Sequence, residues 1–211
     1  MKRLLLLLVM FACGPALAQT SGWYAGGGIG TTRADFVRSD FTALAPGATY
    51  AADDDDVSGR LFGGYRVAPN LAIEVGLASL GSYRHRYSAG GDIAVVDYDA
   101  SALTVAAAGN LPIAGGFSLN GRVGIAFTAT ELRERRNDNG LASIPFCPDS
   151  LWYSDCTSRS TNLYWGLGGQ FDVSPRWGIR LDYDNYGEVG EEFETGRADI
   201  ETWSVNFVWR F

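Results

Sequence analysis

Residues 202–211 read Thr-Trp-Ser-Val-Asn-Phe-Val-Trp-Arg-Phe. Every second residue from Trp203 to Phe211 is apolar, and the residues between them are mostly polar. A period of two is the pattern of a β-strand with one apolar face. Aromatic side chains dominate that face, as they do where the strands of a transmembrane barrel contact lipid. We therefore expect residues 202–211 to form the closing strand of a membrane β-barrel.

The beginning of the sequence predicts export. Two basic residues precede an apolar run over residues 4–12, and the small residues Ala-Leu-Ala follow at 16–18. The run is much shorter than the roughly 20 residues that a membrane-spanning helix needs. This pattern predicts a secretory signal peptide over residues 1–18 and a mature domain over residues 19–211.

Lipidation of Cys13 is the alternative for this segment. It would require cleavage directly before Cys13, but Met10 and Phe11 do not suit a lipidation motif. The small residues at 16–18 would then have no role. We therefore favour the cleaved signal peptide.

The charge and apolar content of the mature chain narrow the class of protein. Removal of Lys2 and Arg3 changes the formal charge from -7 to -9, which argues against nucleic acid as a partner. After residue 18 the sequence has no run of about 18 apolar residues, so membrane-spanning helices are not expected. A chain that crosses a membrane without such helices does so with strands.

The alternation of residues 202–211 recurs along the mature chain. The segments lie at about residues 22–30, 57–67, 71–78, 96–110, 117–128, 161–173 and 177–186. With the last segment they make eight strands of about ten residues. We predict an all-β fold, an eight-stranded antiparallel up-and-down transmembrane β-barrel.

The lengths of the predicted connections alternate. Those at residues 68–70, 112–116 and 174–176 are short, whereas those at 32–56, 81–95, 132–160 and 187–198 are long and polar. Outer-membrane barrels have short periplasmic turns and long external loops. The long segments are therefore expected to lie outside the cell.

Charged residues alternate with the apolar set and would face the lumen. They are Arg60, Arg66, Glu74, Arg122, Arg180 and Asp182. An eight-stranded barrel is just wide enough to be filled by side chains, so we expect a lumen charge network of ion pairs. In the alternative of a narrow gated pore, Glu74 exchanges between arginines such as Arg122 and Arg180. A soluble lipocalin-like barrel would instead turn the apolar faces inward, and these charges leave little room for its ligand cavity.

Several segments resemble one family. They are Gly63-Gly64-Tyr65-Arg66-Val67, Asn70-Leu71-Ala72-Ile73-Glu74, Leu80-Gly81, Leu181-Asp182-Tyr183 and Trp209-Arg210-Phe211. They are similar to the eight-stranded outer-membrane barrels that include the transmembrane domain of outer-membrane protein A and the opacity proteins. The resemblance implies the outer membrane of a Gram-negative cell, with Trp209 and Phe211 as the signal that the barrel-assembly machinery recognises. No peptidoglycan-binding domain follows the eighth strand, so we expect no cell-wall tether from this sequence.

Two cysteines lie in the third long connection. Cys147 and Cys156 form an even pair once Cys13 leaves with the signal peptide, and an oxidising compartment favours their disulfide. So small a closed loop is typically worth about 2–4 kcal/mol. It would stiffen a segment around Trp152, the best candidate for contact with an unidentified extracellular ligand.

A lipid A-modifying enzyme would need a nucleophile and a base at the outer rim. His85 is the only histidine, with Ser82 and Ser88 nearby, but the deacylase barrels place His and Ser two residues apart and here Tyr87 has that position. We expect no enzymatic activity. His85 lies between two arginines, a setting that suits solvent or lipopolysaccharide phosphates.

The acidic run over residues 53–56 lacks the alternating oxygen ligands and the glycine of a calcium loop. The glutamates at 188, 191, 192 and 194 are interpreted in the same way, as solvated loop residues. No metal site and no cofactor is predicted.

Together these features predict a monomeric, non-enzymatic outer-membrane barrel with a structural or surface-interaction role. Its expected partners are outer-membrane lipid, lipopolysaccharide and the barrel-assembly machinery, and not nucleic acid. A narrow gated pore and a lipid A-modifying enzyme remain as alternatives. The sequence does not identify an external ligand.

Overall fold

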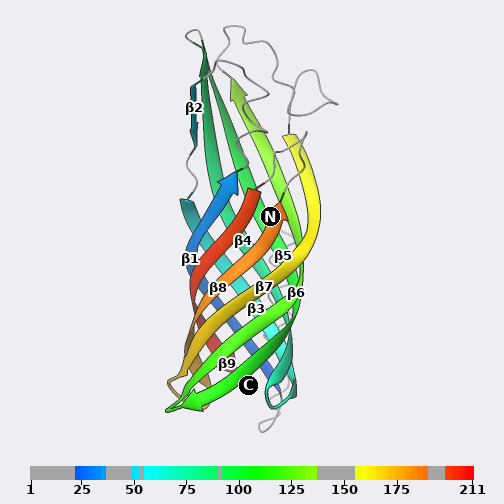
Figure 1. The fold of residues 1–211 in the computed structure, drawn as a ribbon, viewed down its shortest axis with the longest axis vertical. Helices are drawn as coiled ribbons and strands as arrows, with labels where there is room; N and C mark the ends of the chain where they lie inside the picture. Colours follow the sequence, from blue (N-terminus) through cyan, green and yellow to red (C-terminus); the bar gives the residue numbers. More distant parts are fainter. Residues whose placement is uncertain (1–21, 37–48, 53–54, 90–91, 137–154, 190–197) are drawn as a thin grey trace.

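The computed structural model describes residues 22–36, 49–52, 55–89, 92–136, 155–189 and 198–211, which form nine β-strands (Figure 1). The strands are β1 (Trp23–Phe36), β2 (Thr49–Ala52), β3 (Asp55–Ala68), β4 (Leu71–Ala89), β5 (Asp92–Ala114), β6 (Phe117–Arg136), β7 (Asp155–Asp172), β8 (Trp177–Val189) and β9 (Ala198–Arg210). Within these ranges there is no helix long and apolar enough to cross a membrane.

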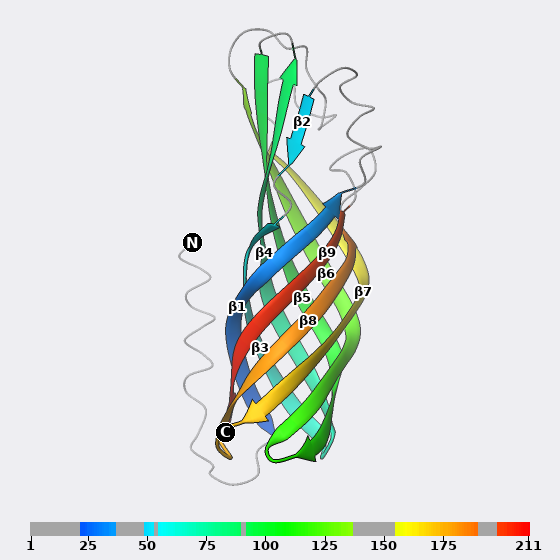
Figure 2. The ribbon, with the colours of Figure 1, turned by 60° about the vertical axis from the view of Figure 1, so that its left-hand side comes forward.

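Eight of the strands form a closed antiparallel barrel. Strands β3 to β8 each pair with the next strand along the chain, β1 pairs with β3, and β1 also pairs with β9 to close the sheet. The short strand β2 adds to the edge of β4 above the barrel (Figure 2). The predicted eight-stranded barrel is therefore confirmed, with one additional strand.

The outer face is apolar and the inner face is polar. On β9, Trp203, Val205 and Phe207 are 47–56% exposed, whereas Ser204 and Asn206 between them are buried. The same alternation leaves large apolar side chains exposed on all eight barrel strands. A soluble barrel has the opposite arrangement, so the lipocalin-like alternative is excluded. The predicted outward faces are confirmed.

The barrel strands are joined by short turns at one end, where the C-terminus also lies (Figure 2). Pro69 and Asn70 connect β3 to β4. Gly115 and Gly116 connect β5 to β6 and both have positive φ, 60° and 83°, as a two-residue hairpin turn requires. Because β5 continues through a bulge near Pro112, this turn is shorter than the predicted segment 112–116.

The prediction of a long loop at residues 81–95 is wrong. Strands β4 and β5 stay paired as far as Ala89 and Asp92, and their hairpin rises above the barrel together with β2 (Figure 2). This segment was expected to be a loop because its residues are polar. A strand that leaves the lipid needs no apolar face, and the tyrosines and valines of this segment favour strand structure.

Two bulges change which residues face the lumen. The pairing of β4 with β5 shifts between Ser79 and Gly81, and that of β8 with β9 shifts between Asn185 and Glu188. Before each bulge the even-numbered residues face inward. Beyond it the odd-numbered residues Tyr83 and Val189 are the buried ones. A bulge has this effect because it inserts one residue into an alternation of two.

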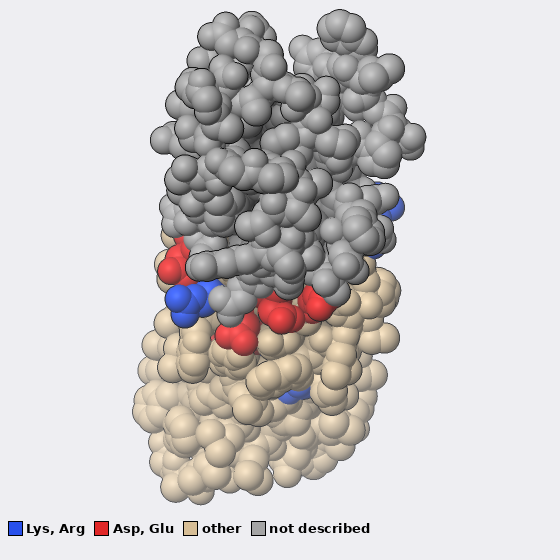
Figure 3. All heavy atoms as spheres, turned by 45° about the horizontal axis from the view of Figure 1, so that its top comes forward, with Lys and Arg blue, Asp and Glu red and all other residues tan. Residues whose placement is uncertain are grey.

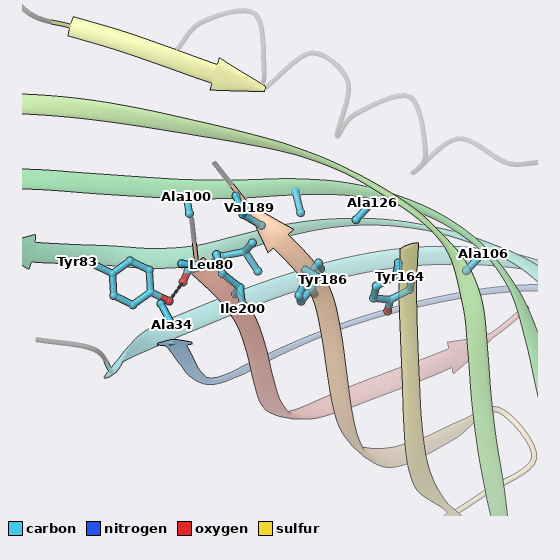
Figure 4. Close-up of a cluster of buried hydrophobic side chains, with 12 residues drawn as sticks. Ala34, Leu80, Tyr83, Ala100, Ala106, Ala126, Tyr164, Tyr186, Val189 and Ile200 are labelled. Carbon is cyan, nitrogen blue, oxygen red and sulfur yellow. Dashed lines mark hydrogen bonds between the residues drawn. The ribbon is translucent and has the colours of Figure 1, made fainter. Parts of the chain in front are cut away.

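The side chains that the bulges turn inward join a buried group near the end of the barrel opposite the short turns, which we call the external end (Figure 4). Tyr83 donates a hydrogen bond from its hydroxyl to the Leu80 carbonyl at 2.8 Å. We call this group the upper apolar cluster. It consists of Ala34, Leu80, Tyr83, Ala100, Ala102, Ala106, Ala126, Tyr164, Tyr186, Val189, Ala198 and Ile200.

Candidate functional site

The barrel interior holds six charged side chains that we call the lumen charge cluster. They are Arg60 on β3, Glu74 on β4, Arg122 on β6, and Arg180, Asp182 and Asp184 on β8. Each of these side chains is at most 5% exposed. Three positive and three negative charges balance within the cluster, which reduces the cost of burying them.

Glu74 is shared by all three arginines. Its Oε1 lies 2.9 Å from Nη2 of Arg60 and 3.5 Å from Nη1 of Arg122, and its Oε2 lies 3.3 Å from Nη1 of Arg180. The hydroxyl of Tyr24 on β1 also donates to Oε2, at 3.0 Å. One carboxylate on β4 is thus connected to four other strands across the lumen.

Asp182 and Asp184 hold the opposite side of the cluster. Arg122 Nη2 lies 3.0 Å from Asp182 Oδ1 and 2.9 Å from Asp184 Oδ1. Arg180 Nε lies 2.8 Å from Asp182 Oδ2, and Arg60 Nη1 lies 2.6 Å from Asp184 Oδ2. Every charged group of the cluster therefore has at least two partners of opposite charge.

Neutral side chains complete these contacts. The Tyr164 hydroxyl donates to Asp184 Oδ1 at 2.6 Å, and Asn206 Nδ2 donates to Asp182 Oδ2 at 2.9 Å. The Phe62 ring lies 4.1 Å from the guanidinium carbon of Arg180, within range of a cation–π contact. The predicted network lacked these residues and also Asp184, although Asp184 continues the inward alternation of Arg180 and Asp182.

The structure brings five of the six predicted charges together and leaves Arg66 out. Arg66 is exposed near the short-turn end of β3. It is six residues from Arg60, about 20 Å along a strand. The assignment of Arg66 to the network is corrected for this reason: alternation gives the face of a strand but not the height along the barrel.

Apolar side chains lie on both sides of the lumen charge cluster, and at the short-turn end Arg122 and Arg180 also line a small cavity. Tyr24, Phe62, Ala72 and Val208 form a second buried apolar group, and the upper apolar cluster contains Tyr164, whose hydroxyl contacts Asp184. The side chains therefore fill the lumen in layers. Within the described ranges no group of three or more His, Cys, Asp or Glu side chains is placed to hold a metal ion.

The remaining predicted site residues lie elsewhere. Trp209 and Phe211 are exposed on the outside of the short-turn end, and their role as an assembly signal stays a prediction. Cys147 and the predicted signal peptide lie outside the described residues. Cys156 is in β7, where its backbone is paired with Leu132, but its side chain is outside the described part, so the disulfide also stays a prediction.

The residues considered for lipid A chemistry lie in the projecting hairpin. The backbone of His85 pairs with Ala52 of β2 and Val96 of β5, and its side chain is outside the described part. The Ser82 hydroxyl donates a hydrogen bond to Asp99. Of the acidic run, Asp56 accepts hydrogen bonds from the backbone N–H groups of Val57 and Ser82.

The arrangement of strands is similar to that of two solved proteins. Neisserial surface protein A has a TM-score of 0.59 and 14% identity, with 90% of this chain and 98% of that chain covered. Ail, the attachment invasion locus protein of Yersinia pestis, has a TM-score of 0.51 and 16% identity, with 91% and 100% covered. Identities this low show a common fold alone, and no curated protein sequence matches the chain.

The family is shown by the sequence as a whole. The family model described as the outer membrane protein beta-barrel domain matches residues 4–211. Since the match spans almost the whole sequence and the fold agrees with it, the chain belongs to the outer membrane protein β-barrel family and is located in the outer membrane.

Proposed function

We propose that this protein is a closed, non-enzymatic barrel that serves envelope structure or surface interaction through its external end. The observation that carries the proposal is the sheet above the barrel. Strands β4 and β5 pair as far as Ala89 and Asp92, β5 and β6 pair as far as Ala94 and Arg136, and β2 extends the sheet. Two proteins of this architecture are named a surface protein and an attachment invasion locus protein, which supports a surface role.

The lengths of the strands support this proposal. A strand needs about 9–11 residues to cross a membrane. Strand β5 has 23 residues and β6 has 20, so about half of each extends beyond one crossing. A paired sheet holds its side chains in place before a partner arrives, which lowers the entropic cost of binding.

Shortening the β4–β5 hairpin tests the proposal. Deletion of residues 84–89 and 92–97 removes six pairs between β4 and β5 and leaves Tyr83 opposite Tyr98 with the two-residue connection unchanged. It also removes the four pairs of β4 with β2 and four pairs of β5 with β6. We expect the shortened barrel to keep its heat-dependent shift in gel mobility. We also expect cells that display it to lose adherence to a cultured epithelial monolayer relative to cells with the wild-type protein at equal surface density.

The matched control exchanges residues 84–89 and 92–97 for alternating Ser and Thr, which keeps the hairpin length. Loss of adherence in both variants supports a contact made by side chains of the hairpin. Equal adherence of wild-type, shortened and empty-vector cells would contradict the surface-interaction role. Envelope integrity would then be the remaining role. The detergent sensitivity of a strain that lacks the protein measures it.

A narrow gated pore is the second candidate. The observation that favours it is the sharing of Glu74 by three arginines, because rotation of one side chain would change its partners. The filled lumen favours the closed state. In planar bilayers we expect no steady conductance from wild-type protein, and a rise in single-channel conductance for Glu74→Ala but not for Asp55→Ala would support the pore.

Lipid A modification has a direct test. The Ser82 hydroxyl donates to the Asp99 carboxylate, and the sequence lacks the spacing of His and Ser that the deacylase barrels have. Mass spectra of lipid A from expressing cells are therefore expected to match those of control cells. Loss of an acyl chain that is abolished by His85→Ala would contradict the non-enzymatic assignment.

A further inference from the structure

A small cavity lies at the short-turn end of the lumen, on the opposite side of the lumen charge cluster from the external sheet. Its volume is about 30 Å³. On this measure about 10–15 Å³ is enough for one water, so the cavity has room for a larger monatomic ion. Three arginines line it, Arg66, Arg122 and Arg180, and none of its lining residues is an aspartate or glutamate.

Four buried donors of the residues lining this cavity make no hydrogen bond among the described residues: Nε and Nη2 of Arg122, Nη2 of Arg180 and Nδ2 of Asn120. Arg122 Nη2 still lies within ion-pair distance of Asp182 and Asp184, which leaves Arg122 Nε, Arg180 Nη2 and Asn120 Nδ2 as the three orphaned donors. The orientation of the Asn120 amide is set because its Oδ1 accepts a hydrogen bond from Asn110 Nδ2 at 3.0 Å. The orphaned groups on the lining residues are thus all donors, and a buried donor without an acceptor costs about 1–3 kcal/mol. The two buried acceptors without a hydrogen bond, Asp182 Oδ1 and Asn206 Oδ1, belong to residues that do not line the cavity.

Charge distinguishes an anion from a water molecule in this setting. The three arginines of the lumen charge cluster are balanced by its three carboxylates. Arg66 adds a positive charge at the cavity wall, next to the exposed mouth of the barrel. A water that accepts from the orphaned donors must also find acceptors for its own two hydrogens, whereas a monatomic anion only accepts.

We propose that this cavity binds a small inorganic anion such as chloride, held by Arg122, Arg180 and Asn120. Arg66 at the wall raises the local concentration of anions. The site is independent of the proposed surface function because it lies at the opposite end of the barrel. Its consequence is a folded barrel that is stabilised by chloride through selective binding to the native state.

The test uses full-length mature protein, refolded in detergent and crystallised with sodium bromide in place of chloride. Bromide should give an anomalous peak in the cavity within hydrogen-bond distance of Arg122 Nε, Arg180 Nη2 or Asn120 Nδ2. In solution, the unfolding temperature of the wild-type barrel should rise with chloride concentration and not with gluconate at the same ionic strength and pH.

The variant Asn120→Asp replaces the orphaned donor with an anionic oxygen and keeps the acceptor for Asn110. It should lose both the bromide peak and the chloride-dependent rise in unfolding temperature. The control Asn185→Asp makes the same change of charge on β8, near the end of the barrel opposite the short turns, and keeps the acceptor for the Gly187 N–H. It should retain both. Bromide crystals with no anomalous peak in the cavity, or equal unfolding temperatures in chloride and gluconate, would overturn the proposal.

Discussion

Glu74 is the single residue on which most of the interior depends. Three guanidinium groups lie within 3.5 Å of its carboxylate, and the side chain is 2% exposed. Glu74→Gln would leave three buried arginines facing two carboxylates. Since an uncompensated buried charge typically costs about 3–5 kcal/mol, we expect the free energy of unfolding to fall by about that amount in urea titrations in lipid vesicles.

The exposed ion pair between Arg33 and Asp55 is the control for Glu74→Gln. These groups are 3.8 Å apart and largely in solvent. Asp55→Asn makes the same chemical change and should alter the free energy of unfolding by less than about 1 kcal/mol. Equal urea midpoints for the two variants would show that the lumen charge cluster does not stabilise the barrel.

The sequence predicted the lumen charge cluster in part, because alternation alone turns Arg60, Glu74, Arg122, Arg180 and Asp182 inward. It did not place them at one height, which is why Arg66 was included wrongly. The neutral partners could not be predicted. Tyr24 and Glu74 are 50 positions apart in the chain, and only the strand register brings them together.

At the scale of elements, the two bulges decide how the external end of the lumen is filled. Gly187 in the β8 bulge has a φ of +73°. A Cβ there would also lie 3.0 Å from Asn162 Cβ and 3.2 Å from the Leu163 carbonyl oxygen. We expect Gly187→Ala to lower the free energy of unfolding by about 1–2 kcal/mol, the cost of a left-handed conformation for a residue with a Cβ. Urea unfolding in vesicles measures the change.

Gly59→Ala is the matched control for this backbone effect. Gly59 is on β3, and a Cβ added to it meets no atom within 4 Å. Its urea midpoint should stay near that of the wild-type protein or rise. A urea midpoint for Gly187→Ala as high as that for Gly59→Ala would mean that the bulge tolerates a side chain at residue 187. Glycine would then not be needed for the bulge that places Val189 inside the barrel.

The bulges also limit how far the alternation in the sequence predicts which side chains face the lumen. Between the turns and the bulges, a strict period of two gave the strands and their faces correctly. Beyond Gly81 the odd-numbered residues face inward in place of the even-numbered ones. An alternation that is continued without the bulge therefore predicts, wrongly, that Tyr83 faces outward. The hairpin at residues 81–95 was missed for a related reason, because above the lipid neither face of a strand needs to be apolar.

At the scale of the whole molecule, the barrel has an apolar belt between two rows of aromatic side chains. Trp165, Tyr183 and Trp203 form one row, with ring centroids 5.1–5.4 Å apart. Trp177, Phe207 and Trp209 form the other, at 5.7–6.3 Å. Figure 3 shows that the lower part of one face is almost free of charge, with carboxylates gathered along its upper border. Aromatic rows flank the lipid-facing band of such barrels, which is about 25 Å tall.

Leu181 lies between these rows and is 51% exposed, so an arginine there would face the lipid. We expect Leu181→Arg to lower the free energy of unfolding in lipid vesicles by about 2–4 kcal/mol, as a cation does near the bilayer midplane. Thr161→Arg is the control, since Thr161 is exposed on β7 beyond Trp165, and it should cost no more than about 1 kcal/mol. A larger loss for Leu181→Arg than for Thr161→Arg would show that the penalty depends on depth and not on the arginine itself. Equal losses for the two variants would mean that the belt has been placed at the wrong height on the barrel.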